Sequence, residues 1–289
     1  MTSPSNPGVP LLEIDNLHLS VPTEGGRAAL LKGVDLTLNK GEVLGVAGES
    51  GCGKSTLIKT ILGITPRKAT VDAGTIRLAG EDLLAAPRSS PLRRTFGFIP
   101  QDPWLAMNPV FKIGTQMMEV LRWNGMPGED ARRIGRGDRA RYRQHLCSLL
   151  EAVRLPDPEG ALERYPHQFS GGQRQRILIA SALASRPRAL LADEPTTALD
   201  VTTQLEILKL LQELVAAHDM TMLFVTHDFG VISQLCDRVA VMYAGRVIET
   251  GETRKIIDEP SDPYTATLID AHPDRGGFSF FGKEGAGRA

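Results

Sequence analysis

The sequence predicts an α/β fold, and three observations lead to this prediction. An apolar run at residues 42–47 is followed by a glycine-rich loop at 48–53, and apolar residues at helical spacing continue over 55–63. Strand-like runs and helical spacing alternate again from residue 189 onward. Between the two regions, about residues 102–183 show helical patterns without strand-like alternation. We therefore expect an α/β core with an inserted helical subdomain.

The individual elements follow from hydrophobic periodicity. At residues 11–21 apolar and polar side chains alternate, with a slip near Asp15 and Asn16 that predicts a bulged strand. Pro and Gly at 22–26 predict a turn after it, and 124–138 is expected to be an exposed connection. Further strands are expected at residues 30–38, 42–47, 74–78, 95–100, 189–192, 221–225 and 238–243, and helices at 55–63, 113–123, 139–154, 173–184 and 203–217.

The length of the chain limits the number of domains that it can form. The chain has 289 residues, which is near the size at which one hydrophobic core stops growing. We expect a flexible tail at residues 1–10 and one domain at 11–250, which contains the helical subdomain at about 102–183. Residues 251–289 are expected to form a C-terminal extension.

Composition excludes several classes of protein. The net charge of −1 argues against a nucleic-acid binder. No apolar run approaches the roughly 20 residues of a membrane span, and the first residues lack the basic-then-apolar order of a signal peptide, so we expect the chain to stay in the cytosol. Three cysteines (Cys52, Cys147 and Cys236) lack C-x-x-C spacing, which argues against a disulfide framework or a cysteine metal cluster.

The glycine-rich loop matches the phosphate-loop pattern G-x-x-x-x-G-K-[ST] in full. Its residues, all predicted to bind ATP, are Gly48, Glu49, Ser50, Gly51, Cys52, Gly53, Lys54, Ser55 and Thr56. Glycines let the backbone turn so that N–H groups point at phosphate oxygens, and the following helix adds its positive dipole end. Lys54 is expected to reach the β- and γ-phosphates, and the Ser55 hydroxyl to ligate Mg²⁺. The helix end and Lys54 should also favour the thiolate form of Cys52.

Two acidic residues end the apolar run at 188–194. Carboxylates at the tip of a buried strand are costly unless they face a cation or a polar site. We therefore expect Asp193 on the Mg²⁺ side and Glu194 in position to polarise an attacking water.

A second glycine pair opens the helix expected at 173–184. The segment reads Phe169-Ser170-Gly171-Gly172-Gln173, an anion-binding helix N-terminus with Ser170 as its cap. With this segment the sequence resembles the ATP-binding-cassette (ABC) ATPases over nearly the whole chain, although Phe169 stands where Leu is commoner. Gln101 matches the family's Q-loop, Ala198-Leu199-Asp200 its D-loop and His227 its switch histidine. The resemblance implies ATP hydrolysis and a P-loop NTPase core of ABC type, with an N-terminal antiparallel β subdomain and an inserted helical subdomain.

The resemblance also implies a role for each matched residue. In such ATPases two nucleotide domains dimerise head to tail, with ATP between the phosphate loop of one and the signature segment of the other. Glu194, His227 and Gln101 would then serve in catalysis, and Ser55, Gln101 and Asp193 would hold Mg²⁺. The residues that would contact ATP held by the partner chain are Ser170, Gly171, Gly172, Gln173 and Asp200.

Local strings look most like the ATP-binding subunits of oligopeptide, dipeptide and nickel importers. They are QDPWLAMNP at 101–109, ADEPTTALDVT at 192–202 and DPYT at 262–265. The resemblance implies the first of two paired ATPase chains, in a homo- or heterodimer with a second ATP-binding subunit. It also implies two transmembrane permease subunits, an external solute-binding protein acting indirectly, and a peripheral position on the cytoplasmic face of the inner membrane. Because residues 251–289 contain no cysteine, we expect no iron–sulfur cluster.

Several alternatives stay open. Peptides are the first expectation for the substrate, with nickel, opines or oligosaccharides as others. A soluble ABC ATPase of translation or DNA repair usually adds a second cassette, a coiled coil or zinc-binding inserts, and none is visible here. No aromatic residue lies between Leu19 and Leu31 to stack on adenine, so Val21 or the arm of Arg27 is expected to cover the base.

Overall fold

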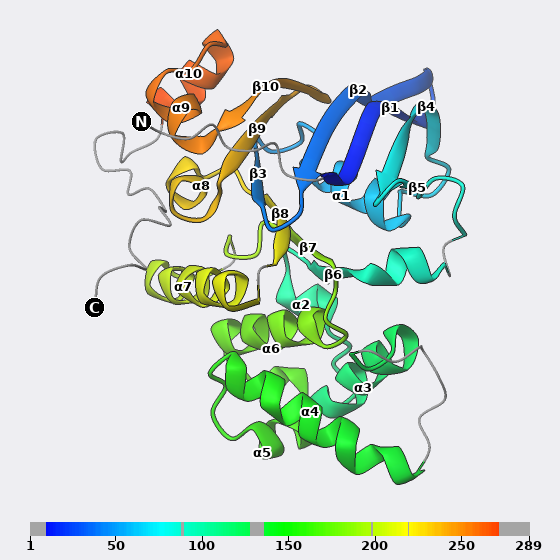
Figure 1. Cartoon of the computed structure of the whole chain (residues 1–289), viewed down its shortest axis with the longest axis vertical. Coiled ribbons are helices and arrows are strands. Elements are labelled where there is room, and N and C mark those ends of the chain that lie inside the picture. Colours follow the sequence, from blue (N-terminus) through cyan, green and yellow to red (C-terminus); the bar gives the residue numbers. More distant parts are fainter. Residues whose placement is uncertain (1–9, 88–89, 128–135, 198, 219, 272–289) are drawn as a thin grey trace. The chain divides into compact units, whose positions relative to one another are not determined.

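The computed structural model describes residues 10–87, 90–127, 136–197, 199–218 and 220–271 (Figure 1). The chain divides into two compact units: Met1–Arg88 together with Asp219–Ala289, and Ser89–His218. Residues 1–9, most of the expected N-terminal tail, lie outside the described part, whereas Pro10 begins the first strand. None of the helices that the structure describes is long and apolar enough to cross a membrane.

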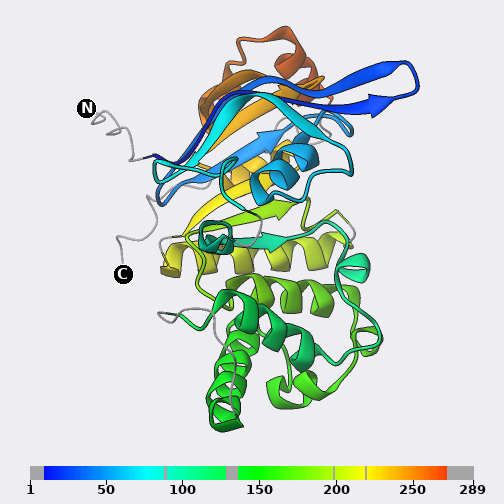
Figure 2. The ribbon, with the colours of Figure 1, turned by 90° about the vertical axis from the view of Figure 1, so that its right-hand side faces the viewer.

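An antiparallel sheet occupies one side of the first unit, with strands in the order β2-β1-β4-β5. These strands are β1 (Pro10–Thr23), β2 (Gly26–Asn39), β4 (Thr70–Leu78) and β5 (Glu81–Asp82), and Figure 2 shows the long β1–β2 hairpin in side view. The register slips between Ile14 and Leu17, where Asn16 has a left-handed φ of 45°. The bulge expected near Asp15 and Asn16 is confirmed.

Four further strands of the first unit run in the order β10-β9-β3-β8. β3 (Val43–Ala47) is parallel to both β8 (Thr221–Val225) and β9 (Arg238–Tyr243). Every residue of β3 and β8 is buried, which explains why their sequences read as continuous apolar runs rather than alternating ones. Helix α1 (Lys54–Leu62) follows the glycine-rich loop, and α8 (Phe229–Leu235) follows β8.

The predicted C-terminal extension contains helices that the sequence analysis did not assign. β10 (Arg246–Glu252) runs antiparallel to β9 and passes through the expected boundary at 251. Two helices follow, α9 (Thr253–Asp258) and α10 (Pro263–Asp270). Residues 272–289 lie outside the described part.

In the second unit, β6 (Phe96–Ile99) and β7 (Ala189–Asp193) pair as parallel strands. Most helices of this unit lie between these two strands in the sequence. Short 3-10 turns lie at Pro91–Thr95, Arg136–Asp138 and Pro166–Gln168. The helices are α2 (Pro103–Ala106), α3 (Ile113–Asn124), α4 (Arg139–Ala152), α5 (Pro158–Glu163), α6 (Gly171–Leu183) and, after β7, α7 (Val201–His218). Helices α3 to α6 pack on one another, as both views show. Since no strand interrupts the described residues between β6 and β7, the inserted helical subdomain is confirmed.

Gly97 marks the closest approach of α6 to β6. A Cβ atom on Gly97 would lie 2.4 Å from the Ala182 carbonyl oxygen and 2.6 Å from Leu190 Cδ2. Neither the backbone oxygen nor the buried leucine can move far in a packed interior. The contact between helix and strand therefore depends on the absence of a side chain at this position.

We predict that Gly97→Ala lowers the free energy of unfolding by about 1–3 kcal/mol, because the added methyl group overpacks this contact. The midpoint of thermal unfolding measured by circular dichroism tests it. Gly25→Ala is the matched control, since a Cβ there would meet nothing within 4 Å. Equal midpoints for the two variants would contradict the predicted packing.

Candidate active site

The phosphate loop of the first unit depends on glycine for its shape. Gly48, Gly51 and Gly53 have φ angles of 150°, 83° and 115°, a region that residues with a Cβ rarely adopt. At Gly48 a Cβ would also lie 2.3 Å from the Met242 carbonyl oxygen on β9. The loop therefore packs directly against β9, and its glycines allow tight turns of the backbone. These features fit a cradle for phosphate oxygens.

Lys54 is folded onto the loop that precedes it. Its side chain is buried, and its Nζ donates hydrogen bonds to the carbonyl oxygens of Gly48 (2.7 Å) and Glu49 (2.9 Å). Helix α1 starts here, because the Leu57 amide donates to the Gly53 carbonyl at 2.9 Å. The amides of a first helical turn have no intrahelical acceptor and carry the positive end of the dipole. The ammonium group and the helix end thus converge where the sequence predicts phosphate.

Cys52 does not behave as the sequence predicts. The side chain is only 7% exposed, and this burial raises the pKa of its thiol, although the nearby Lys54 charge lowers it in part. Desolvation disfavours the charged form more strongly than the ammonium group favours it. The expectation of a thiolate is therefore wrong, and Cys52 serves as a small buried spacer in the loop.

His227 and the phosphate loop both follow the carboxyl ends of neighbouring parallel strands. β3 and β8 are in register with Val46 opposite Val225, and the Thr226 amide donates to the Val46 carbonyl at 3.2 Å. Both strands therefore end side by side. His227 is exposed just beyond the end of β8, and the following Asp228 caps α8 by accepting from the Val231 amide. The predicted switch histidine therefore follows β8, and the phosphate loop follows the neighbouring strand β3.

The predicted acids of the second unit are buried at the end of β7. Asp193 is 4% and Glu194 9% exposed, and Glu194 has a left-handed φ of 45°. Glu194 Oε2 accepts hydrogen bonds from Gln101 Nε2 (3.3 Å) and from the Thr197 hydroxyl (3.0 Å). Gln101 arrives there because β6 is parallel to β7, with Ile99 opposite Ala192. These two donors hold the carboxylate in a fixed orientation.

The signature segment caps its own helix. Ser170 Oγ accepts from the Gln173 amide (3.3 Å), and the Gln173 side chain accepts from the Ser170 amide (3.0 Å), a reciprocal capping box. A Cβ on Gly172 would lie 2.5 Å from Thr203 Cγ2. Gly172 therefore lies against the first turn of α7, which is the element that follows the D-loop.

Asp200 caps that same turn of α7. Its carboxylate accepts from the Thr203 amide (3.0 Å) and from the Thr203 hydroxyl (2.7 Å), and these two bonds hold the pKa of Asp200 below its usual value. The structure thus brings Asp200 and the signature segment together through Thr203. Ala198, the first residue of the predicted D-loop, lies outside the described residues.

Sequence reasoning missed a contact between the Q-loop region and the signature helix. The Arg174 guanidinium on α6 lies 3.2 Å from the centre of the Trp104 ring on α2. Arg174 is buried and Trp104 is 58% exposed, so the stack covers the cation and leaves the outer ring face to solvent. α2 is one turn long and too short to give a periodic signal, which is why no sequence pattern revealed the pair.

The residues expected to cover adenine occupy the antiparallel sheet. Arg27 Nε donates to Ser20 Oγ at 2.8 Å, and its Nη2 reaches the Asp72 carboxylate at 3.5 Å. Its guanidinium is therefore engaged, and only its aliphatic stem is left to cover a base. Val21 is partly exposed on the neighbouring strand, opposite Ala28.

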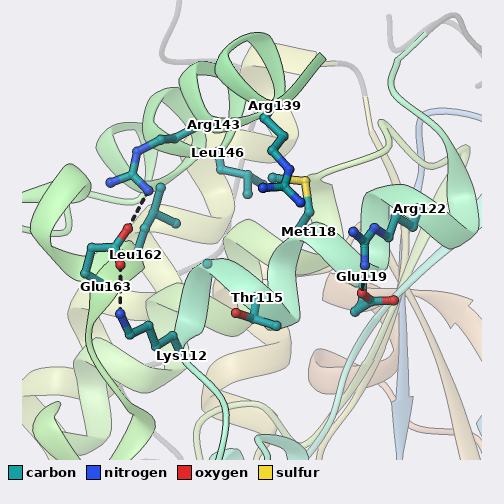
Figure 3. A pocket seen from close by; sticks show the side chains of 11 residues that line it. Lys112, Thr115, Met118, Glu119, Arg122, Arg139, Arg143, Leu146, Leu162 and Glu163 are labelled. Carbon is teal, nitrogen blue, oxygen red and sulfur yellow. Dashed lines mark hydrogen bonds and ion pairs between the residues drawn. The ribbon is translucent and has the colours of Figure 1, made fainter. Parts of the chain in front are cut away.

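A cavity of about 430 Å³ lies among α3, α4 and α5 in the second unit (Figure 3). Its lining includes Glu163, which accepts from Lys112 (3.0 Å) and Arg143 (2.6 Å), and these two bonds lower the pKa of Glu163. Glu119 pairs with Arg122 across the same wall. None of the site residues predicted from the sequence lines this cavity.

A phosphate loop after a buried parallel strand, together with a buried acid pair at the end of another, defines a P-loop NTPase. Comparison with known protein families then narrows the class. Residues 31–197 match the model described as ABC transporter. The chain therefore belongs to the ABC transporter family, and it is an ATP-binding ATPase.

Individual relatives agree with this family. The dipeptide transport ATP-binding protein DppD of Bacillus subtilis (strain 168) is 42% identical, over 91% of this chain and 77% of its own length. The oligopeptide transport ATP-binding protein OppD of the same organism is 41% identical, over 91% and 72%. A solved dimeric structure of the ATP-binding cassette MJ0796 bound to ADP and Pi is similar with a TM-score of 0.71 and 27% identity. It covers 84% of this chain and 99% of its own, which confirms the ABC-type fold.

We predict that Cys52 in the folded chain reacts with iodoacetamide at neutral pH about tenfold or more slowly than in urea, because its thiol is buried and its pKa is raised. Mass spectrometry of peptides alkylated for increasing times measures the rate at each cysteine. The half-buried Cys147 is the internal reference. Faster labelling of Cys52 than of Cys147 in the folded chain would contradict the prediction.

Proposed function

We propose that this chain is the ATP-hydrolysing subunit of an importer that takes up peptides or a related small solute. The proposal is supported by the peptide-transport relatives and by the strings at 101–109, 192–202 and 262–265. The relatives do not favour the alternative solutes nickel, opines or oligosaccharides. No described feature favours a soluble ABC ATPase of translation or DNA repair.

In this proposal residues 48–56 bind the triphosphate of ATP. Lys54 exchanges its two carbonyl partners for the β- and γ-phosphates, so the ammonium group is available without a large movement of α1. Ser55, Gln101 and Asp193 would hold Mg²⁺, which when bound neutralises charge on the phosphates. Such sites need few protein ligands, because the nucleotide and waters complete the magnesium shell.

The single observation that carries the catalytic assignment is the geometry at Glu194. Its carboxylate is buried and oriented by Gln101 and Thr197, so it can accept a proton from an attacking water without reorienting. Gln101 would also contact that water and Mg²⁺. His227 would contact the γ-phosphate from the end of β8.

The signature residues Ser170, Gly171, Gly172 and Gln173, with Asp200, would serve ATP held by a second subunit. The amides of Gly171 and Gly172 open α6, where amides have no intrahelical acceptor and can donate to an anion. The similar cassette MJ0796 is dimeric. We propose a homo- or heterodimer with a second ATP-binding subunit, in which this chain is the first of the pair. A γ-phosphate shared across the interface stabilises only the closed dimer, so hydrolysis reopens it.

The membrane partners would dock on the segment after Gln101. Large apolar side chains are exposed there: Trp104 (58%), Leu105 (87%), Val110 (72%) and Phe111 (51%). An exposed apolar group of this kind is typical of a protein interface. Two transmembrane permease subunits would cover it, which makes the chain a peripheral protein on the cytoplasmic face of the membrane. An external solute-binding protein would act through those permeases.

We predict that Glu194→Gln keeps ATP affinity and lowers turnover by about 10²–10⁴-fold, because the amide cannot take the proton from water. Calorimetry and phosphate release measure the two properties, and size-exclusion chromatography with ATP should show trapped dimers. Glu213→Gln is the control, since it changes an exposed carboxylate paired with Arg154. Turnover within about twofold of the original chain would remove Glu194 from the catalytic role.

Co-expression with the neighbouring genes tests the transport role. We predict that this chain co-purifies with membrane proteins in detergent, and that replacing Leu105 and Phe111 by Ser weakens the association while ATP binding is kept. The physical reason is the loss of apolar area that the permeases would bury. If the chain never associates with membrane proteins, the importer proposal is wrong.

A further inference from the structure

The cavity among α3, α4 and α5 combines apolar side chains with charged ones (Figure 3). Leu146 and Leu162 line it from the interior, and they are only 1% and 2% exposed. Met118 of α3 adds a half-buried apolar wall. A volume of about 430 Å³ lies within the range of roughly 300–1,000 Å³ that is typical of small-molecule sites. The cavity is therefore large enough for a small organic molecule, and it offers that molecule an apolar surface.

The charged side chains around this cavity carry an excess of positive charge. Four of them are basic and two are acidic: Lys112, Arg122, Arg139, Arg143, Glu119 and Glu163. Glu163 accepts from Lys112 at 3.0 Å and from Arg143 at 2.6 Å. Glu119 pairs with Arg122. Each carboxylate is thus engaged by a basic neighbour, and the excess of two positive charges is left to attract an anion.

Arg139 is the basic residue of this lining that has no partner. Its guanidinium makes no ion pair or hydrogen bond with another residue of the described ranges. Arg139 is the first residue of α4, and Figure 3 shows its side chain directed into the cavity on the side of Met118. A guanidinium presents several N–H donors in one plane, which match the oxygens of a carboxylate. An anionic group that enters the cavity therefore finds its strongest available partner at Arg139.

The two acidic residues of the lining limit the charge of such a ligand. Hydrogen bonds from Lys112 and Arg143 lower the pKa of Glu163, so this carboxylate stays ionised at neutral pH. Glu119 adds a second negative charge to the lining. A nucleoside triphosphate or another polyanion is repelled by both carboxylates. A single carboxylate at Arg139, joined to an apolar body that lies on the leucines, fits the charges and the apolar surface together.

We propose that this cavity is a binding site for a small organic monocarboxylate that carries an apolar body. The carboxylate pairs with Arg139, and the apolar body covers Leu146, Leu162 and Met118. The site lies within the second unit and contains none of the residues assigned to ATP or Mg²⁺, so it does not depend on the proposed nucleotide site. The ligand contacts α3, α4 and α5 at once, and its binding stabilises the folded subdomain.

The test uses 4-phenylbutyrate, which carries one carboxylate on an apolar body, and its neutral analogue 4-phenylbutanamide. We expect 4-phenylbutyrate to bind the full-length chain with a Kd on the order of 0.1–1 mM, measured by ligand-observed NMR titration. The amide should bind about tenfold more weakly or less, because it offers Arg139 no negative charge. Acetate should also bind about tenfold more weakly or less, because it lacks the apolar body.

Substitutions in the chain locate the bound molecule. Arg139→Ala should raise the Kd for 4-phenylbutyrate about tenfold, because it removes the partner of the carboxylate. Arg188→Ala is the matched control, since it deletes an exposed arginine of the same unit that does not line the cavity, and it should leave the Kd unchanged. Met118→Gln should raise the Kd about threefold, because the apolar body would then lie against a polar amide.

Equal affinity for 4-phenylbutyrate and its amide, or an unchanged Kd for Arg139→Ala, would overturn the inference. Absence of binding at about 10 mM 4-phenylbutyrate would also overturn it, since a site with a millimolar Kd is mostly occupied at that concentration. The midpoint of thermal unfolding of each variant, measured without ligand, ensures that an unfolded chain is not mistaken for one that has lost the site.

Discussion

The close contact between the phosphate loop and β9 is the constraint on which the rest of the first unit depends. Gly48 has no side chain, and the Met242 carbonyl occupies the space where one would be. The loop can therefore lie flat against the sheet, which fixes the start of α1 and lets Lys54 fold over the Gly48 and Glu49 carbonyls. In the turn after β9, the Gly245 amide donates to the Cys52 carbonyl and so binds the loop to the same strand.

In the second unit, neighbouring hydrogen-bond donors stabilise a buried charge. Glu194 is buried, and a buried carboxylate is stable only with donors close by. Gln101 and Thr197 supply those donors from two separate loops. Thr203 likewise joins Asp200 to Gly172 of the signature segment. The carboxylates of Glu194 and Asp200 are thus each held by hydrogen bonds from neighbouring side chains, which keeps them oriented.

Sequence patterns predicted the core elements well where a strand or helix is long and periodic. The bulge at Asn16, the buried runs of β3 and β8 and the helix after Lys54 all appear as expected. The short elements α2, α9 and α10 were missed, since helices of four to eight residues give little periodic signal. The prediction of a thiolate at Cys52 was wrong, because the sequence shows which charged residues are nearby but does not show that the thiol is buried.

The sequence by itself determined the class of this protein, because glycines, a lysine and a serine at fixed spacing specify a phosphate loop through local backbone geometry. It also determined that two acids end a buried strand. Only the tertiary structure decided which residues meet: Gln101 with Glu194, Trp104 with Arg174, and Tyr264 with Tyr243. Such pairs join segments that are distant along the chain. Their contacts depend on strand register and on packing, and neither quantity is encoded in local spacing.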